Sequence, residues 1–228
     1  MASIDQRLQQ VKERIARACA RAGRDVQSVT LLAVSKGQPA QAIREAYGAG
    51  LRDFGENYVQ EALEKIDATA DLRASVRWHL IGPLQSNKTR VVAQHFDWVH
   101  TVDRSRIAQR LSDQRPSTLA PLQICLQVNI DREPSKAGLD PDAVALVARS
   151  VIALPGVRLR GLMSVPAPRA GFEAQFQPHL ALGQVLGQLV GGAEPLDTLS
   201  MGMSVDLEAA VAAGATIVRV GTGLFGPR

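Results

Sequence analysis

Aromatic residues, cysteines and long apolar runs are all scarce in this sequence, and each shortage excludes a class of protein. Only 4% of the 228 residues are aromatic, and no block of lysine and arginine is interleaved with them, so we expect no nucleic-acid surface. The two cysteines, Cys19 and Cys125, have neither metal-ligand spacing nor the density of a disulfide scaffold, which favours a reducing cytoplasm. No apolar run approaches the roughly 18 residues of a membrane span. Charged residues soon after Met1 argue against a signal peptide.

The rest of the composition suits one globular domain. Hydrophobic residues make up 46% of the chain, which is enough for a full core, and the formal net charge is +4. A mild positive excess leaves room for a small anionic ligand. Single α/β barrels run to about 200–250 residues, so we expect one domain over residues 1–228.

Short β-rich runs alternate with helical segments along the chain. Apolar residues recur at helical spacing from Ile4 to Ala22, and Gly23 ends this first helix. Eight strands are expected after it, at 30–34, 52–54, 77–81, 98–101, 122–129, 159–163, 198–201 and 216–220. Helical patterning between them is clearest at 40–49, 140–153, 172–189 and 205–213, whereas 167–171 and 191–195 are short enough to be loops.

Strands that alternate with helices pair in parallel through right-handed crossovers, and eight such units close into a (β/α)₈ TIM barrel. The first helix then lies outside the repeat. A doubly wound open sheet is the competing arrangement, but no G-x-G-x-x-G follows the first strand. We therefore expect an α/β barrel.

The loops after the last two strands have the composition of a phosphate site, and barrels often bind phosphate there. Hydroxyl groups donate to phosphate oxygens, and glycine lets backbone N–H groups approach closely. Ser204 also stands where a helix beginning at Val205 would present its amino terminus to an anion. Serine and glycine dominate ordinary turns as well, but both loops together favour phosphate. The residues concerned are Ser200, Gly202, Ser204, Gly221, Thr222 and Gly223.

Lys36 and Arg219 are the charged candidates at strand ends. Lys36 follows an apolar strand and is either a solvated strand end or a desolvated amine able to form an imine. Spacing alone leaves both open; a facing phosphate would favour a phosphorylated aldehyde. Arg219 lies between two valines in a buried strand and needs a partner. That partner is either a carboxylate such as Asp206 or the ring nitrogen of a ligand, which the guanidinium would keep unprotonated.

Other polar residues near strand ends are weaker candidates. Asn57, Ser164, Asn87 and Lys136 could contact a ligand, although capping and solvated loops are the default explanations. His79 lies inside the third strand and is expected to be a satisfied core histidine. The remaining histidines lack metal-ligand spacing.

Six segments, in order along the whole chain, resemble the family of pyridoxal phosphate homeostasis proteins, also called YggS/PROSC. They are AVSK at 33–36, FGENYVQE at 54–61, WHLIGPLQSNK at 78–88, GLMS at 161–164, LSMGMSVD at 199–206 and VRVGTGLFG at 218–226. The resemblance implies the barrel half of the alanine-racemase-like architecture, fold type III, with pyridoxal 5′-phosphate (PLP) as the cofactor.

The resemblance also implies roles for single residues. Lys36 matches the lysine that forms the Schiff base, Ser200, Gly221 and Thr222 match phosphate-contacting positions, and Arg219 matches the arginine at the pyridine nitrogen. Asn57, Ser164, Met201 and Ser204 complete the expected cofactor-binding set. Two positions depart from the family: Gln38 replaces a second lysine, which puts any relay role there in doubt, and Leu80 replaces an aromatic residue or methionine, which changes packing only.

Three functions are open at this point. The resemblance favours a non-catalytic protein that holds PLP as a reversible imine, takes part in cofactor, amino-acid and keto-acid balance, and releases PLP transiently to apo-enzymes. A racemase of the alanine-racemase type would need an acid/base tyrosine from a further domain. The chain ends at Arg228, its only tyrosines are Tyr47 and Tyr58, and neither matches that position, so we expect a monomer without catalysis. An unrelated phosphorylated ligand would use the loops but not Lys36.

Overall fold

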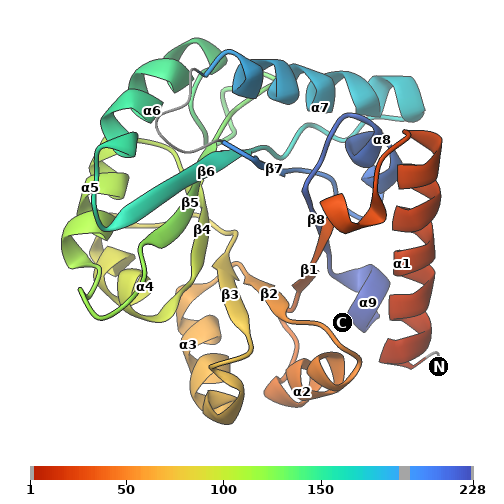
Figure 1. Ribbon diagram of the computed structural model, residues 1–228, viewed down its shortest axis with the longest axis horizontal. Coiled ribbons are helices and arrows are strands. Elements are labelled where there is room, and N and C mark those ends of the chain that lie inside the picture. Colours follow the sequence, from red (N-terminus) through yellow and green to blue (C-terminus); the bar gives the residue numbers. More distant parts are fainter. Residues whose placement is uncertain (1–2, 190–195, 227–228) are drawn as a thin grey trace.

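Eight parallel strands close into a barrel in sequence order, and helices surround it (Figure 1). The computed structural model describes residues 3–189 and 196–226. The strands are β1 Thr30–Val34, β2 Asp53–Glu56, β3 Arg77–Leu80, β4 Trp98–Val102, β5 Leu122–Gln127, β6 Val157–Met163, β7 Thr198–Ser200 and β8 Ile217–Val220. The helices are α1 Ile4–Arg21, α2 Ala40–Gly48, α3 Val59–Ala68, α4 Thr89–His95, α5 Ser105–Gln114, α6 Val144–Ile152, α7 Phe172–Gly187, α8 Leu207–Ala212 and α9 Thr222–Phe225.

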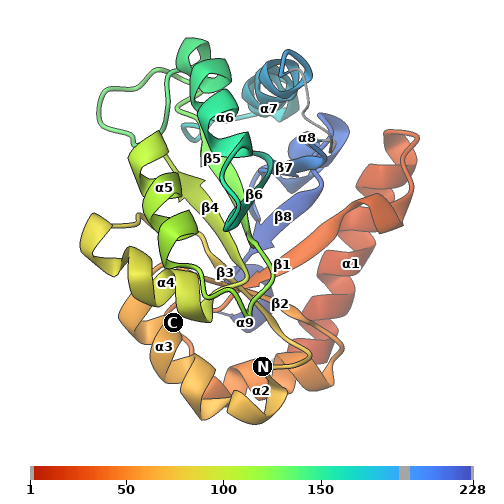
Figure 2. The ribbon, with the colours of Figure 1, turned by 60° about the vertical axis from the view of Figure 1, so that its left-hand side comes forward.

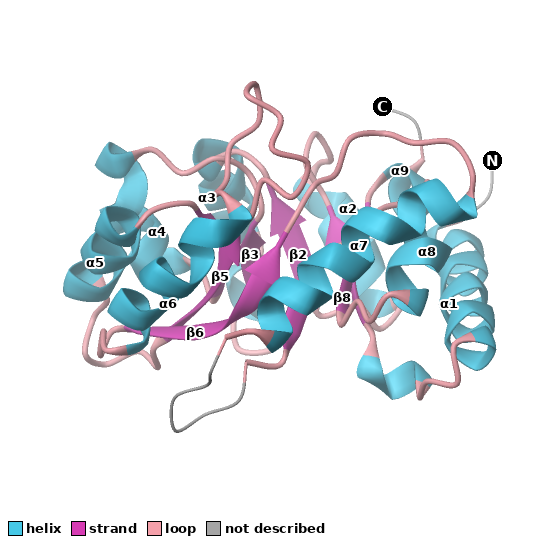
Figure 3. Ribbon diagram, turned by 90° about the horizontal axis from the view of Figure 1, so that it is seen from above, coloured by secondary structure: helices cyan, strands magenta, loops and turns pink. Residues whose placement is uncertain are grey.

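Pairing of the first strand with the last closes the sheet. Thr30 and Leu32 of β1 lie opposite Ile217 and Arg219 of β8, and each other strand pairs with its successor. Figure 3 shows the helices arranged around the strands. The predicted barrel is therefore confirmed, and the open sheet is excluded.

All eight predicted strands are present, and the first has the predicted bounds. Several helix boundaries differ from the expected ones, with α6 beginning at Val144 rather than 140, and one difference bears on the candidate site. α8 begins at Leu207 rather than Val205, because the Asp206 carboxylate accepts the Met203 N–H and closes a turn before the helix. Ser204 therefore does not stand at a helix amino terminus. The predicted loop at 191–195 lies outside the described residues.

The first helix covers the seam where the barrel closes. Ser3 and Gln6 form a capping box at its start, and an apolar stripe including Val11 and Ile15 is buried. Arg14 donates to both oxygens of Glu208, at 2.7 and 2.8 Å, and to the carbonyl oxygen of Ser204. Figures 1 and 2 both show α1 on the outside of the barrel, and it contacts α8 and α9. Helix α1 is thus fixed to the loop that follows β7.

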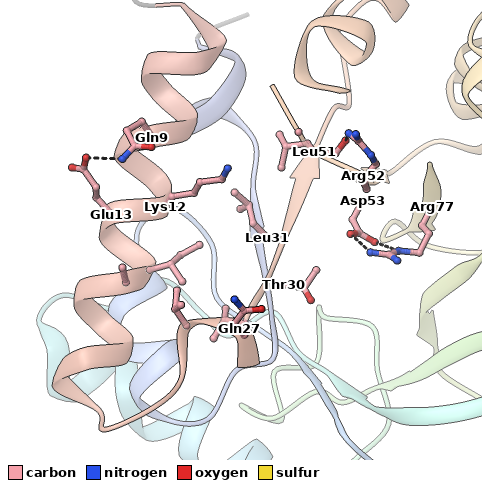
Figure 4. Close-up of a pocket in the computed structure, with 15 residues that line it drawn as sticks. Gln9, Lys12, Glu13, Gln27, Thr30, Leu31, Leu51, Arg52, Asp53 and Arg77 are labelled. Carbon is pink, nitrogen blue, oxygen red and sulfur yellow. Dashed lines mark hydrogen bonds and ion pairs between the residues drawn. The ribbon is translucent and has the colours of Figure 1, made fainter. Parts of the chain in front are cut away.

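A groove of about 690 Å³ lies at the amino-terminal ends of the first strands, between α1 and the loop before β2. Lys12 of α1, Leu51 and the paired Asp53 and Arg77 line it (Figure 4). In barrels of this type the chemistry lies at the opposite, carboxyl-terminal face, so this groove is not the candidate site. Among the described helices, none is long and apolar enough to cross a membrane.

Candidate functional site

The closed barrel brings the predicted residues to one face. Strand register places Met163 opposite Ser200 and Leu32 opposite Arg219. A Cβ on Gly221 would lie 3.2 Å from the carbonyl oxygen of Val34, so the loop after β8 closely approaches the end of β1. The residues after β1, β6, β7 and β8 therefore surround a common mouth, as the sequence analysis expected.

Lys36 lies in the loop after β1, and a buried ionic cluster of Glu56, Glu61 and Lys65 anchors this loop. The Ser35 hydroxyl donates to Glu56 at 2.5 Å, and the Lys65 ammonium donates to the Ser35 carbonyl oxygen and to Glu56, each at 2.7 Å. The Gly37 N–H donates to Glu61. The two residues on either side of Lys36, Ser35 and Gly37, are therefore held in place by hydrogen bonds to this cluster.

Lys36 is a half-buried residue, and its amine makes no hydrogen bond or ion pair with the described part of the chain. Lys65, in contrast, is almost fully buried and bonded to three oxygens. Burial raises the pKa of the Glu56 carboxyl, although Lys65 and Ser35 counteract that effect. Of these two lysines, Lys36 is the one available to a ligand.

Arg219 is a buried cation whose partners are all neutral. Its Nη1 donates to the carbonyl oxygen and hydroxyl of Ser200, at 2.6 and 2.9 Å, and its Nη2 donates to the carbonyl oxygen of Ser164 at 2.8 Å. No carboxylate forms an ion pair with it among the described residues, Asp206 included. Burial lowers the pKa of Arg219 to about 10, which leaves it charged at neutral pH. A buried charge without a counter-ion is characteristic of functional sites.

Two predicted side chains present unpaired polar atoms to the interior. Asn57 Oδ1 and Ser164 Oγ are buried and have no hydrogen-bond partner among the described residues. The Asn57 backbone packs directly against Gly82. Only glycine allows this close approach, because a Cβ on Gly82 would lie 2.0 Å from the Asn57 carbonyl oxygen. Native proteins rarely leave buried polar atoms unpaired, so these two atoms indicate a missing polar partner.

The loops after β7 and β8 meet at Ser204 and Gly223. A Cβ on Gly223 would lie 3.4 Å from Ser204 Oγ. Gly202 has φ +87, and a Cβ there would lie 2.4 Å from the Ala210 side chain, so the turn requires glycine. The N–H groups of Thr222 and Gly223, in the first turn of α9, have no acceptor among the described residues. Backbone donors of this kind suit an anion.

The structure also contains a line of hydrogen-bonded polar side chains, Asp53, His79, His100 and Ser200, that sequence patterns did not predict. His79 Nε2 lies 3.0 Å from Asp53 Oδ1, and His79 Nδ1 lies 2.9 Å from His100 Nε2. His100 Nδ1 lies 2.8 Å from Ser200 Oγ. The prediction that His79 is a satisfied core residue is confirmed. The missed signal was a polar residue at a buried position in each of three consecutive strands.

The remaining candidates differ in exposure. Met201 is fully buried. Asn87 is exposed, and Lys136 pairs with Glu133 at 3.1 Å, so both follow the default explanations. A contact between any of these residues and a cofactor stays a prediction.

Comparison with known proteins identifies the relatives. Residues 6–228 match the family model described as alanine racemase, N-terminal domain. A protein of Pseudomonas aeruginosa named pyridoxal phosphate homeostasis protein is 56% identical over all of this chain and 97% of its own length.

Two solved structures extend the comparison. PipY of Synechococcus elongatus, determined with PLP bound, is 42% identical and superposes with a TM-score of 0.78 over 95% of this chain and 100% of its own. The alanine racemase of Corynebacterium glutamicum is 15% identical with a TM-score of 0.68, over 96% of this chain and 61% of its own. The latter likeness concerns the fold alone.

Proposed function

Because this chain belongs to the family of pyridoxal phosphate homeostasis proteins, we propose that it binds PLP through a Schiff base on Lys36 and holds it for release. PLP bound to PipY supports the choice of cofactor. The observation that carries the proposal in this chain is a set of unsatisfied groups at one mouth. They are the Lys36 amine, the buried oxygens of Asn57 and Ser164, and the free N–H groups of Thr222 and Gly223.

These groups match the chemistry of the cofactor. PLP supplies an aldehyde that condenses reversibly with a lysine amine, and it carries a phosphate and a ring nitrogen. The glycine-rich loops after β7 and β8 supply N–H donors for an anion, and Lys36 supplies the amine. The proposed binding set is Lys36, Asn57, Ser164, Ser200, Met201, Ser204, Arg219, Gly221 and Thr222.

Arg219 has a defined part in this proposal. A guanidinium can only donate hydrogen bonds, so a ring nitrogen facing it would accept one and remain unprotonated. An unprotonated ring withdraws electrons poorly. This arrangement suits holding the cofactor better than carbanion chemistry, and we infer that the protein is a carrier rather than a racemase.

The proposal is tested by binding and by turnover. PLP should give the wild-type protein a visible absorbance band, Lys36→Ala should lose that band, and the exposed control Lys88→Ala should keep it. An unchanged spectrum in Lys36→Ala would refute the assignment. For the alternative, racemisation should be assayed over a panel of amino acids, with Tyr58→Phe as a further variant. Ordinary enzyme rates that require Lys36 would favour a racemase.

Partners, assembly and location stay predictions. We infer transient contact with apo-enzymes that need PLP, a monomeric state and a cytoplasmic location. Transfer is tested by mixing loaded protein with a PLP-requiring apo-enzyme and following recovery of its activity against an equal amount of free PLP. Recovery no faster than PLP dissociates from the carrier would exclude direct transfer.

A further inference from the structure

A continuous line of hydrogen bonds runs through the barrel interior from Asp53 to Arg219. Asp53 is the first residue of β2 and lies at the groove shown in Figure 4. His79 of β3, His100 of β4 and Ser200 of β7 follow, with successive separations of 3.0, 2.9 and 2.8 Å. Arg219 of β8 completes the line with a 2.9 Å bond to the Ser200 hydroxyl. The line joins the two ends of the barrel.

Each of the two terminal residues can act in only one way in a hydrogen bond, either as a donor or as an acceptor. Arg219 has donors only, and an ionised carboxylate has acceptors only. Burial alone would raise the pKa of Asp53, but hydrogen bonds from Arg77 and His79 hold it well below its usual range. Burial holds the pKa of His100 well below its usual range too, so that ring is neutral. A neutral imidazole has one donor and one acceptor.

We propose that the line has a single direction, from Arg219 through Ser200, His100 and His79 to Asp53, and that Asp53, His79 and His100 are positioning residues for Arg219. Each bond then uses one hydrogen. The Ser200 hydroxyl donates to His100 Nδ1, His100 Nε2–H donates to His79 Nδ1, and His79 Nε2–H donates to Asp53. Both rings carry their hydrogen on Nε2.

The opposite arrangement would place a proton on each nitrogen of His79. The charged and titratable groups next to that ring are Asp53 and His100, with Arg77 on the other side of Asp53, while Arg219 lies beyond His100. Arg77 already pairs with both oxygens of Asp53, each at 2.6 Å. A cationic His79 would be a second positive charge on one carboxylate, and its ring is 1% exposed and stacked on Trp98. Two cations would then share one carboxylate, and the net buried positive charge would be costly.

The direction of the line changes the role of Ser200. Its only hydrogen is used by His100, and its oxygen accepts from Arg219. Ser200 would therefore orient Arg219 and would not donate to a phosphate, which leaves that task to the loop around Gly221 and Thr222. This consequence for the cofactor rests on the proposed function, whereas the direction of the line does not.

Long-range ¹H–¹⁵N correlation NMR of the ring-labelled, ligand-free protein tests the direction. The chain has four histidines, His79, His95, His100 and His179, and single His→Gln variants assign their signals. We expect both His79 and His100 to be neutral with the hydrogen on Nε2. A doubly protonated His79, or a hydrogen on Nδ1 of either ring, would overturn the proposal.

Binding of PLP tests the positioning role separately. His100→Leu removes the acceptor of the Ser200 hydroxyl and should weaken binding on the order of tenfold. His100→Gln keeps an acceptor and should recover most of that loss, and the exposed control His95→Gln should bind as wild type. Equal affinity in His100→Leu, or no recovery in a folded His100→Gln, would contradict the role. If the wild-type protein binds no PLP, the proposed function fails while the NMR result still decides the direction.

Discussion

Replacing Lys65 by methionine should strongly destabilise the protein, because it would leave a buried carboxylate without its counter-ion. The Lys65 ammonium lies 2.7 Å from Glu56, and their side chains are 6% and 0% exposed. Removing one partner of a buried ion pair costs about 3–5 kcal/mol. In a chain of this size that corresponds to a fall in the melting temperature of roughly 6–20 °C.

Urea unfolding at neutral pH measures this loss. Lys88→Met, at an exposed position, is the matched control and should change the unfolding free energy by less than about 0.5 kcal/mol. Adding Glu56→Gln to Lys65→Met should recover much of the stability, since the buried charge is then gone. If Lys65→Met is as stable as the control, the buried pair of Lys65 and Glu56 does not stabilise the loop that carries Lys36.

The same cluster predicts a dependence on pH. Because burial raises the pKa of Glu56, the native state keeps this proton to higher pH than the unfolded state, whose value is about 4.3. The contribution of Glu56 to stability is therefore complete below that value and declines as the pH rises through the raised pKa. Glu56→Gln should remove this part of the pH dependence, measured as unfolding free energy against pH.

Two further substitutions test the geometry of the site. Gly82→Ala would place a Cβ 2.0 Å from the Asn57 carbonyl oxygen and should lower the free energy of unfolding by about 1–3 kcal/mol or more. The control Gly48→Ala, where nothing lies within 4 Å of the added Cβ, should not lower it. Equal melting temperatures of the two variants would contradict the close packing at Gly82. Ser164→Ala removes a buried hydroxyl that has no partner among the described residues, so the ligand-free protein should be no less stable. Its affinity for PLP should nevertheless fall by about tenfold. The melting temperature of the ligand-free variant checks the first expectation, and calorimetric titration with PLP checks the second.

The barrel could be predicted because its signal is local. Each strand is a short apolar run between helical segments, and eight repeats admit few topologies. Because the carboxyl ends of parallel strands meet at one face of a barrel, the strand ends alone predict that Lys36, Ser164 and Arg219 lie on that face. The start of α8 could not be predicted in this way, because it depends on a turn that the Asp206 carboxylate closes by accepting the Met203 N–H.

The polar interior could not be predicted in the same way. The contact of His79 with His100 depends on the register of β3 against β4, in which His79 lies opposite Trp98, and periodicity does not give register. The partners of Arg219 are two carbonyl oxygens and one hydroxyl, which no residue pattern marks. Sequence patterns therefore predict which residues lie at the mouth of the barrel, but not the hydrogen bonds that orient their side chains.

Reductive trapping tests the central claim most directly. The lysines of the chain are Lys12, Lys36, Lys65, Lys88 and Lys136, so one peptide map distinguishes them. After incubation with PLP and reduction with borohydride, we predict that the pyridoxyl label is found on Lys36 and that the other lysines are unmodified at equimolar PLP. Label spread evenly over the exposed lysines, or absent from Lys36, would contradict the account.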